Sequence, residues 1–332
     1  MKAAVLYEPG PGPRLRIEER SGSEPGPGCV RIRVEACGVC HTDLHIVEGE
    51  LPPLRRPVVP GHQVVGRIDA VGPAVDPGML GQRVGVGWLG FADGTCDQCR
   101  AGRENLCERA QFTGYHLDGG YAQAMVAHAD FVHRLPEGPD AVQLAPLLCA
   151  GVVGWRALTL SGASAGSRLG LYGFGASAHL VLQVARQLGS EVVVFTRGTE
   201  HRRLALELGA VWAGSAETVS PPGGPLQAAI IFAPAGELVP LALRALDRGG
   251  TLVLAGIYMS PLPSLPYELL WQERVIRSVA NGTRDDAREL LSLAARSPLR
   301  VEAEEHPLES INGVLERLKA GQVRGAAVVR LA

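Results

Sequence analysis

Residues 36–45, ACGVCHTDLH, bring two cysteines, two histidines, a threonine and an aspartate into ten positions. Thiolate and imidazole groups are ligands of zinc, and paired thiols can also form disulfides. Hydroxyl and imidazole groups carry protons in general acid–base catalysis. Taken alone, this stretch fits a metal site, a disulfide or a chance grouping, because a metal site needs further ligands from other parts of the chain.

A glycine-rich loop follows at residues 170–178, GLYGFGASA, with a G-x-G-x-x-A spacing. The loop comes after a predicted strand and opens a predicted helix, which is the context that a dinucleotide fingerprint requires. Its first glycine makes the tight turn, its second lets the backbone approach a pyrophosphate, and its alanine permits close helix–strand packing. A chance glycine turn is the alternative. The residues predicted to contact the cofactor here are Gly173, Phe174, Gly175, Ala176, Ser177 and Ala178.

The end of the next predicted strand, VVVFTRGTEHRR (192–203), bears on which dinucleotide binds. NAD enzymes place a carboxylate there for the ribose 2′-hydroxyl, but this chain has Thr196, followed by Arg197 and, one helical turn on, Arg202. Cations attract a 2′-phosphate. We therefore expect NADP to be preferred over NAD, unless the two arginines are only solvated surface charges.

The elements that must position these residues fall into two classes. Residues 1–147 contain short apolar runs broken by Gly and Pro, such as KAAVLY and VRIRVEA, which indicates an all-β unit. From about 150 to 283, apolar strands alternate with amphipathic helices, which indicates a parallel sheet covered on both faces. A helix is expected over LVPLALRALDRGG (238–250), and the tail adds helices near 285–296 and 308–320 and a last strand, GAAVVRL.

Composition narrows the classes of function. The chain has 332 residues, is 46% hydrophobic and carries a net charge of −2, which gives no reason to expect nucleic acid or a membrane as partner. The N-terminus shows no signal peptide and no apolar run reaches the roughly 20 residues of a membrane helix, so we expect a cytoplasmic protein. Seven cysteines in such a chain favour metal binding over disulfides.

The order of these motifs resembles the zinc-dependent alcohol dehydrogenases of the medium-chain dehydrogenase/reductase family over essentially the whole chain. The motifs that carry the resemblance are GVCHTDLH, PGH…G…VG, the cysteine lobe, TGY…GGYA, LLCAG, the GxGxxA loop and LKAGQVRGAAVV. The resemblance implies an α/β protein with two domains. A GroES-like, β-rich catalytic domain is expected from residues 1–148 and 284–332, and a Rossmann domain with a doubly wound parallel sheet from residues 149–283.

The resemblance also implies a catalytic zinc ion held by Cys40, His62 and Cys149. Two thiolates and one imidazole neutralise the ion and leave its fourth tetrahedral position open for a substrate oxygen. The alternative for Cys149 is a buried core thiol. Asp43 is expected to hold the second nitrogen of the ligand histidine.

Three further roles are implied around this site. Thr42 accepts the proton of the alcohol and passes it through the cofactor ribose to His45, which reaches solvent, while His41 contacts the pyrophosphate. The alternative for both histidines is a plain surface position. Trp88 and Trp155 are expected to be walls of the substrate pocket, unless they are core aromatics.

One departure from the family concerns the residue after the ligand histidine. The family has Gly-His-Glu, with the glutamate near the zinc and implicated in ligand exchange, whereas this chain has Gly61-His62-Gln63. A neutral Gln63 removes a negative charge beside the metal, which should make zinc a stronger Lewis acid and slow exchange.

A second departure concerns the cysteine lobe, residues 93–107. The family places four cysteines here for a structural zinc ion, and this chain has Asp93 in the first position, followed by Cys96, Cys99 and Cys107. Because a carboxylate is a legitimate but harder ligand, an Asp–Cys₃ zinc site is chemically sound. The alternative is an empty lobe that is held by packing and open to oxidation.

The sequence therefore predicts an NADP-preferring, zinc-dependent enzyme that transfers hydride between a small alcohol and the corresponding aldehyde or ketone. The alternatives are a zinc-free quinone or enoyl reductase of the same fold, and a catalytically silent NADP-binding protein. The resemblance implies a homodimer or homotetramer, and the apolar stretch TLVLAGIYMSPLPSLP (251–266) serves either an interface or a core strand and its loop.

Overall fold

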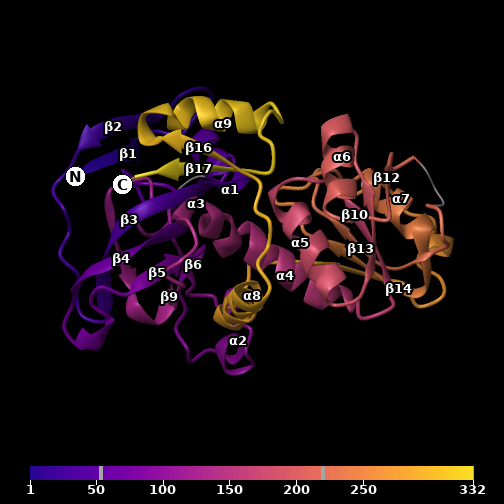
Figure 1. Ribbon diagram of the computed structural model, residues 1–332, viewed down its shortest axis with the longest axis horizontal. Helices are drawn as coiled ribbons and strands as arrows, with labels where there is room; N and C mark the ends of the chain where they lie inside the picture. The colour runs from indigo at the N-terminus through magenta and orange to yellow at the C-terminus, as the bar shows by residue number, and fades with distance from the viewer. Residues whose placement is uncertain (52–54, 218–220, 332) are drawn as a thin grey trace. The chain divides into compact units, whose positions relative to one another are not determined.

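The computed structural model of the protein describes residues 1–51, 55–217 and 221–331 (Figure 1). The chain divides into two compact units. Unit 1 consists of Met1–Val152 and Asn281–Ala332, and unit 2 of Val153–Ala280. Each unit has its own sheet and its own hydrophobic core, so they are described separately.

Unit 1 is built on a seven-stranded sheet in which β3 has the central position. The strand order is β16-β17-β3-β4-β5-β9, and β8 also pairs with β3. The strands are β3 (Cys29–Val39), β4 (Gln63–Val71), β5 (Arg83–Val86), β8 (Ala124–His128), β9 (Val132–Arg134), β16 (Ala303–Pro307) and β17 (Ala326–Arg330). β17, from the end of the chain, pairs antiparallel with β3, and Figure 1 shows its yellow arrow beside the indigo strand.

Smaller elements complete unit 1. β1 (Lys2–Leu6) pairs with β2 (Leu15–Glu19), and β6 (Leu89–Phe91) pairs with β7 (Gln111–Phe112). The α-helices are α1 (His41–Glu48), α2 (Asp97–Arg100), α3 (Ala141–Leu144), α8 (Arg284–Arg296) and α9 (Ile311–Lys319). The 3₁₀ turns are η1 (Pro77–Met79), η2 (Glu104–Leu106), η3 (Ala129–Phe131), η4 (Ala145–Leu148) and η6 (Leu308–Ser310).

The expectation that residues 1–147 are all-β is wrong at α1. This helix begins directly after β3 and ends at Gly49, whose φ of 85° gives the left-handed cap that stops a helix. It buries Leu44, Ile46 and Val47. Eight residues give only two turns, which is too short for the 3.6-residue period to stand out in the sequence.

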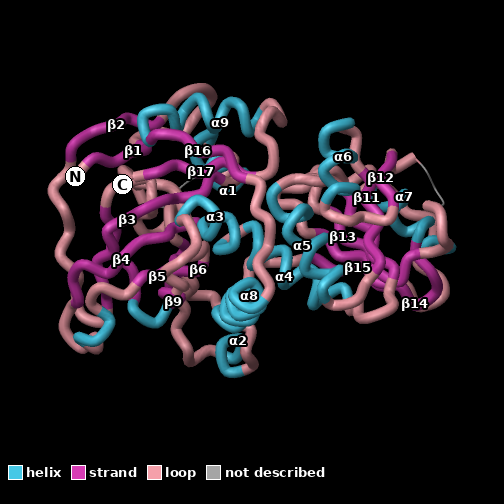
Figure 2. Tube along the Cα trace, viewed as in Figure 1, coloured by secondary structure: helices cyan, strands magenta, loops and turns pink. Residues whose placement is uncertain are grey.

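Unit 2 has a six-stranded sheet of parallel strands in the order β12-β11-β10-β13-β14-β15. The strands are β10 (Arg168–Tyr172), β11 (Glu191–Phe195), β12 (Trp212–Gly214), β13 (Leu226–Ile231), β14 (Leu246–Leu254) and β15 (Val275–Ser278). The helices are α4 (Ala150–Ser161), which starts in unit 1, α5 (Ala176–Gln187), α6 (Thr199–Glu207), α7 (Leu238–Ala245) and the 3₁₀ turn η5 (Tyr267–Leu269). Figure 2 shows these strands in magenta with helices in cyan around them, and the predicted doubly wound parallel sheet is confirmed.

Unit 2 differs from the sequence prediction at the end of α7, and its strand order reverses at β10. The helix expected over 238–250 is too long, because α7 ends at Ala245 and the chain enters β14 at Leu246, which is buried and pairs with Leu226 of β13. The strand order also reverses at β10, whose neighbours are β11 and β13. In open parallel sheets this switch point is where ligands bind at the carboxyl ends of the strands.

Within the described ranges, no single helix is long and apolar enough to cross a membrane. One bent pair, Ala141–Leu148 with Ala150–Ser161, meets the length and composition criteria together.

An ion pair ties the cysteine lobe to the start of α8. The Glu104 carboxylate in η2 accepts hydrogen bonds from the backbone N–H of Arg284 at 2.8 Å and from its guanidinium at 2.6 and 3.0 Å. The guanidinium carbon also lies 4.5 Å from the centroid of the Phe131 ring. Burial alone would raise the pKa of Glu104, but the hydrogen bonds and charge of Arg284 hold this pKa below its usual value.

Replacing Glu104→Gln should therefore lower the free energy of unfolding at pH 7 by about 1–3 kcal/mol, between the values for exposed and buried ion pairs. Because the pKa is depressed in the folded state, this contribution is present above the pKa of the unfolded chain and is lost as the pH falls through the folded pKa. Denaturant unfolding at pH 7 and in acid measures both effects, with Glu108→Gln on an exposed neighbour as the control. Equal stability of the two variants at pH 7 would contradict the assignment.

Candidate active site

Cys40 lies where the chain passes from β3 into α1. It is the residue that caps α1, and its backbone N–H donates to Oδ2 of Asp43 at 2.9 Å, which satisfies a free donor at the helix start. Its Sγ lies 3.6 Å from Oγ1 of Thr42. The first turn of α1 thus fixes the thiol and the Thr42 hydroxyl side by side.

The Asp43 carboxylate behind this turn is fully buried and accepts four hydrogen bonds from three segments of the chain. Oδ2 accepts from the N–H of Cys40 at 2.9 Å and the hydroxyl of Tyr121 at 2.8 Å. Oδ1 accepts from the N–H of Gly61 and from Nδ1 of His62, each at 3.1 Å. A buried carboxylate needs this many donors because it has lost the water that would solvate it.

His62, just before β4, has two nitrogens in different surroundings. Nδ1 donates to Asp43, so in the neutral ring Nε2 carries the lone pair. Nε2 is buried and has no hydrogen-bond partner among the described residues. The indole ring of Trp88 meets the imidazole edge-on, with ring centroids 4.8 Å apart. A buried nitrogen without a partner costs free energy, and a metal ion would use its lone pair.

Cys149 completes this group from the turn between η4 and α4. The ligand atoms of Cys40, His62 and Cys149, which we call the catalytic cluster, all lie within 4.8 Å of one another. All three residues belong to unit 1. Two sulfurs, one imidazole nitrogen and a carboxylate behind the imidazole are a donor set that fits zinc.

The charges in the cluster favour a cation. Burial alone lowers the pKa of His62, but the charge and hydrogen bond of Asp43, together with Cys40, raise it to about 10. Hydrogen bonding by the Cys149 thiol, aided by His62, holds the pKa of Cys40 well below its usual value. The site therefore holds a thiolate and a carboxylate and draws positive charge to the imidazole, and a metal cation satisfies the same charges.

The side chains expected to move protons lie along α1. Thr42 is buried, and His45, three residues on, lies on the same side of the helix. Nδ1 of His45 hydrogen bonds to a carboxylate oxygen of Glu50. His41 begins the helix and is exposed.

Gln63 is the first residue of β4 and lies opposite Gly38 of β3. Its side chain is buried, and a Cβ added to Gly38 would lie 2.9 Å from the Gln63 amide carbon. The absence of a side chain at Gly38 therefore leaves the space that Gln63 occupies next to His62.

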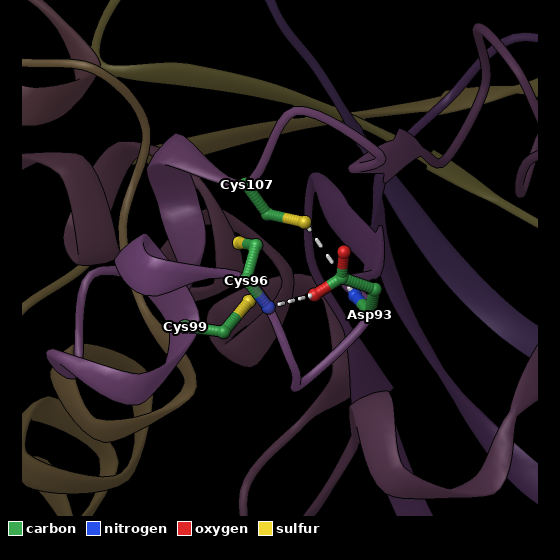
Figure 3. Close-up of side chains that lie close together, drawn as sticks. All are labelled: Asp93, Cys96, Cys99 and Cys107. Atoms are coloured by element: carbon green, nitrogen blue, oxygen red, sulfur yellow. Dashed lines mark hydrogen bonds between the residues drawn. The ribbon is translucent and has the colours of Figure 1, made fainter.

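The cysteine lobe forms a second ligand group in unit 1. The side chains of Asp93, Cys96, Cys99 and Cys107 point toward one another in Figure 3, and their ligand atoms all lie within 4.8 Å. Oδ1 of Asp93 accepts from the N–H groups of Thr95 and Cys96 at 2.8 and 2.9 Å. These backbone donors hold the pKa of Asp93 well below its usual value, so the carboxylate is ionised. Its Oδ2 lies 3.7 Å from Nε of Arg109, whose side chain is largely exposed.

In unit 2, the glycine loop joins β10 to α5 at the switch point of the sheet. Gly173 has a φ of 87°, which favours glycine, and a Cβ there would lie 2.9 Å from the backbone nitrogen of Ala233. A Cβ on Gly175, which caps α5, would meet nothing within 4 Å. The space over Gly175 and the helix start is therefore open to a phosphate, and Ala178 of α5 is fully buried.

Thr196 is buried directly after β11, and its carbonyl oxygen accepts a hydrogen bond from Nε of Arg202 at 2.8 Å. This hydrogen bond holds Nε of Arg202, and with it the guanidinium group, at the carboxyl end of β11. Arg197 is exposed next to Thr196. Thr196, Arg197 and Arg202, which are expected to contact the adenosine ribose, thus all come shortly after the carboxyl end of β11.

Comparison with known proteins adds independent support. The Alcohol dehydrogenase GroES-like domain matches residues 26–137, and the Zinc-binding dehydrogenase family matches residues 178–296. The "Probable alcohol dehydrogenase AdhA" of Mycobacterium tuberculosis is 47% identical over 99% of this chain and 97% of that protein. An alcohol dehydrogenase of Geobacillus stearothermophilus is 38% identical over 100% of both chains.

The chain belongs to the zinc-type alcohol dehydrogenases of the medium-chain dehydrogenase/reductase family. Solved structures agree with this. The alcohol dehydrogenase from Aeropyrum pernix is 31% identical with a TM-score of 0.88 and covers 99% of this chain and 100% of that chain. The acetophenone reductase from Geotrichum candidum, solved with NAD, is 27% identical with a TM-score of 0.88 and covers 99% and 96% of the two chains. The predicted family, fold and enzyme class are confirmed.

Three residues of the site in this alcohol dehydrogenase were not predicted from the sequence. Tyr121 and Gly61 donate to Asp43, and Glu50 is the partner of His45. The only signal for Tyr121 was its place in the TGY…GGYA motif, and nothing marked Glu50. Both roles depend on contacts between side chains that a linear pattern does not contain.

Proposed function

We propose that this alcohol dehydrogenase holds a catalytic zinc ion at Cys40, His62 and Cys149 and interconverts small alcohols with aldehydes or ketones. The observation that carries this proposal is the buried, unpartnered Nε2 of His62 beside two thiols, with Asp43 fixing the other ring nitrogen. Unit 1 would then be the catalytic domain, and unit 2, with the glycine loop, the dinucleotide-binding domain.

Bound zinc supplies a Lewis acid for the substrate oxygen, and the bound nicotinamide supplies the hydride acceptor. Side chains of the protein would transfer the proton of the alcohol. Oγ1 of Thr42, beside the Cys40 sulfur, accepts the proton of the alcohol, and His45 carries it onward with Glu50 as its partner. His41 would contact the pyrophosphate, and Gln63 would leave the metal with one negative charge fewer than the family glutamate does.

A cluster of three aromatic side chains beside His62 favours substrates that have an apolar part. Trp88 contacts the imidazole and stacks on Phe112 at 5.0 Å and on Tyr115 at 6.0 Å between ring centroids. These rings give the cluster an apolar side. The other expected wall, Trp155, lies in α4 in unit 2, and its role stays a prediction.

Metal analysis of the purified enzyme tests the proposal. We expect about two zinc ions per chain, because both the catalytic cluster and the cysteine lobe have four-coordinate zinc chemistry. Cys149→Ser should leave one ion and abolish oxidation of a panel of alcohols. Cys96→Ser should also leave one ion, and Cys29→Ser, outside both groups, should keep two.

Each proposed site has its own contradicting result. A single zinc ion in the wild type that Cys149→Ser removes would show that the lobe is empty. Turnover that survives removal of all zinc by a chelator would indicate the zinc-free reductase. Full zinc content without turnover of any alcohol, aldehyde or ketone would indicate the silent binding protein.

For the cofactor, we propose a preference for NADP. Thr196 in place of a carboxylate removes the group that would bind a 2′-hydroxyl and repel a 2′-phosphate, and the carbonyl of Thr196 anchors Arg202 beside it. The nearby carboxylate of Glu200 is paired with Arg203. The guanidinium of Arg202 would then donate to the phosphate.

Kinetics with both cofactors check this preference. The wild type should have the higher kcat/KM with NADP, and Arg202→Ala should lower that value by about 10–100-fold, as expected for loss of a charge-assisted hydrogen bond. The matched control is Arg203→Ala, whose guanidinium pairs with Glu200 and Glu207 on the same helix. A clear preference of the wild type for NAD would refute the proposal.

For the assembly, we propose a homodimer that forms through the free edge of unit 2. Among the described residues, β15 is the last strand of its sheet and pairs only with β14. Tyr267 and Trp271, just before it, are 75% and 58% exposed. The other exposed apolar side chains of this region are Ile257, Tyr258, Leu262 and Val275. The unpaired N–H and C=O groups of an edge strand can pair with another strand, and a copy of β15 related by a two-fold axis would pair antiparallel with it.

Sedimentation measures the assembly directly. The wild type should sediment as a dimer or a multiple of it, and Val275→Arg should yield the 35.0 kDa chain. Val211→Arg, at an exposed valine beside the opposite edge strand β12, is the matched control and should leave the assembly intact. A monomeric wild type, or a Val275→Arg protein that assembles normally, would exclude this interface.

A further inference from the structure

The segment of residues 118–121 runs beside residues 59–61 and holds them by backbone hydrogen bonds. The N–H groups of Gly119, Gly120 and Tyr121 donate to the carbonyls of Val59, Gly61 and Pro60 at 2.7, 2.9 and 3.0 Å. Oδ1 of Asp118 accepts from the N–H of Val59 at 2.9 Å. These hydrogen bonds therefore hold the backbone of residues 59–61, which leads directly into His62.

The Tyr121 side chain lies directly against the residue that precedes His62. Gly61 has a φ of 95°, and a Cβ there would lie 2.7 Å from Cδ1 of the Tyr121 ring. The ring is completely buried, and its hydroxyl donates to Oδ2 of Asp43 at 2.8 Å. Burial, together with the charge of Asp43, raises the pKa of this hydroxyl well above its usual value, so the hydroxyl keeps its proton and acts as the donor.

We propose that Tyr121 is a positioning residue for the metal ligand His62, acting through the carboxylate of Asp43. The inference rests on the proposed zinc site. Tyr121 fixes one oxygen of the carboxylate while His62 binds the other, so the hydroxyl sets the plane in which Oδ1 receives the imidazole N–H. Without the hydroxyl, the carboxylate can rotate toward its remaining donors, and the lone pair of Nε2 loses its fixed direction.

The alternative role for Tyr121 is packing alone, since its ring also fills the space over Gly61. The two roles separate when only the hydroxyl is removed. Tyr121→Phe keeps the ring and its contacts but deletes the donor to Asp43. Tyr172→Phe is the matched control, because Tyr172 is also buried, stacks on Phe195 with ring centroids 4.2 Å apart and belongs to unit 2, whereas Asp43 belongs to unit 1.

Zinc affinity, measured by equilibrium competition with a chromophoric chelator, is the first readout. Zinc of the cluster is identified as the zinc that Cys149→Ser lacks, and zinc of the lobe serves as an internal reference. Tyr121→Phe should weaken binding at the cluster by about 10–100-fold, the usual effect of removing a residue that orients a ligand. The lobe of the same variant, and both sites of Tyr172→Phe, should be unchanged.

A thermodynamic cycle with Asp43→Asn tests whether the hydroxyl acts through the carboxylate. In the Asp43→Asn background, the further change Tyr121→Phe should alter cluster affinity less than about threefold, because an amide has only one acceptor oxygen and cannot accept from both Tyr121 and His62. The absorption of cobalt bound at the cluster should also change between wild type and Tyr121→Phe, and not between wild type and Tyr172→Phe. Should Asp43→Asn fail to fold, the affinity and the cobalt spectrum of Tyr121→Phe decide the question.

The outcomes distinguish this inference from the proposed function. A wild type that takes up no zinc dependent on Cys149 overturns the proposed zinc site and the inference with it. A wild type that binds zinc there while Tyr121→Phe binds it equally well overturns the inference alone. An equal loss in the Asp43 and Asp43→Asn backgrounds would show that the hydroxyl does not act through the carboxylate, and would overturn the inference as well.

Discussion

A buried carboxylate is stable only where donors replace the water that it has lost, and that constraint organises the catalytic cluster. Asp43 has no exposed surface and receives hydrogen bonds from the start of α1, from the turn before β4 and from the segment around Tyr121. Each donor fixes one of these segments relative to the others. The same carboxylate orients His62 and compensates positive charge at its ring, so a single anion sets both the shape of the cluster and its preference for a cation.

The two units contain different kinds of candidate site: groups of ligand side chains in unit 1 and a glycine loop in unit 2. Unit 1 contains both ligand groups, the catalytic cluster and the cysteine lobe, and each is assembled from residues of that unit alone. Unit 2 presents the glycine loop at the switch point of a parallel sheet, where the backbone leaves open space over Gly175. Metal chemistry thus depends on side chains of a few types at fixed places, whereas dinucleotide binding depends on backbone shape and a helix terminus.

The sequence could predict the parts of the site that depend on residue type and order along the chain. The ordered motifs resemble a family that implied Cys40, His62 and Cys149 as one group, and their ligand atoms do lie within 4.8 Å of one another. The alternation of strands and helices predicted the sheet of unit 2. The helix α1 was missed because two turns show no period, and the end of α7 was missed because the pairing of Leu246 with Leu226 overrides local helix propensity. Tyr121 could not be assigned a role, because its contact with Asp43 requires the positive φ of Gly61 and the course of a distant segment.

The pairing of β17 with β3 has a consequence for how the protein is made. A chain that leaves the ribosome from its N-terminus presents β3 long before its neighbour β17 has been translated. Residues 153–280 include all six strands of the second sheet, so that unit can fold as soon as it has emerged, while the first still lacks β16 and β17. The edge of β3 at residues 36–39 therefore stays unpaired during most of synthesis, until β17 has been translated.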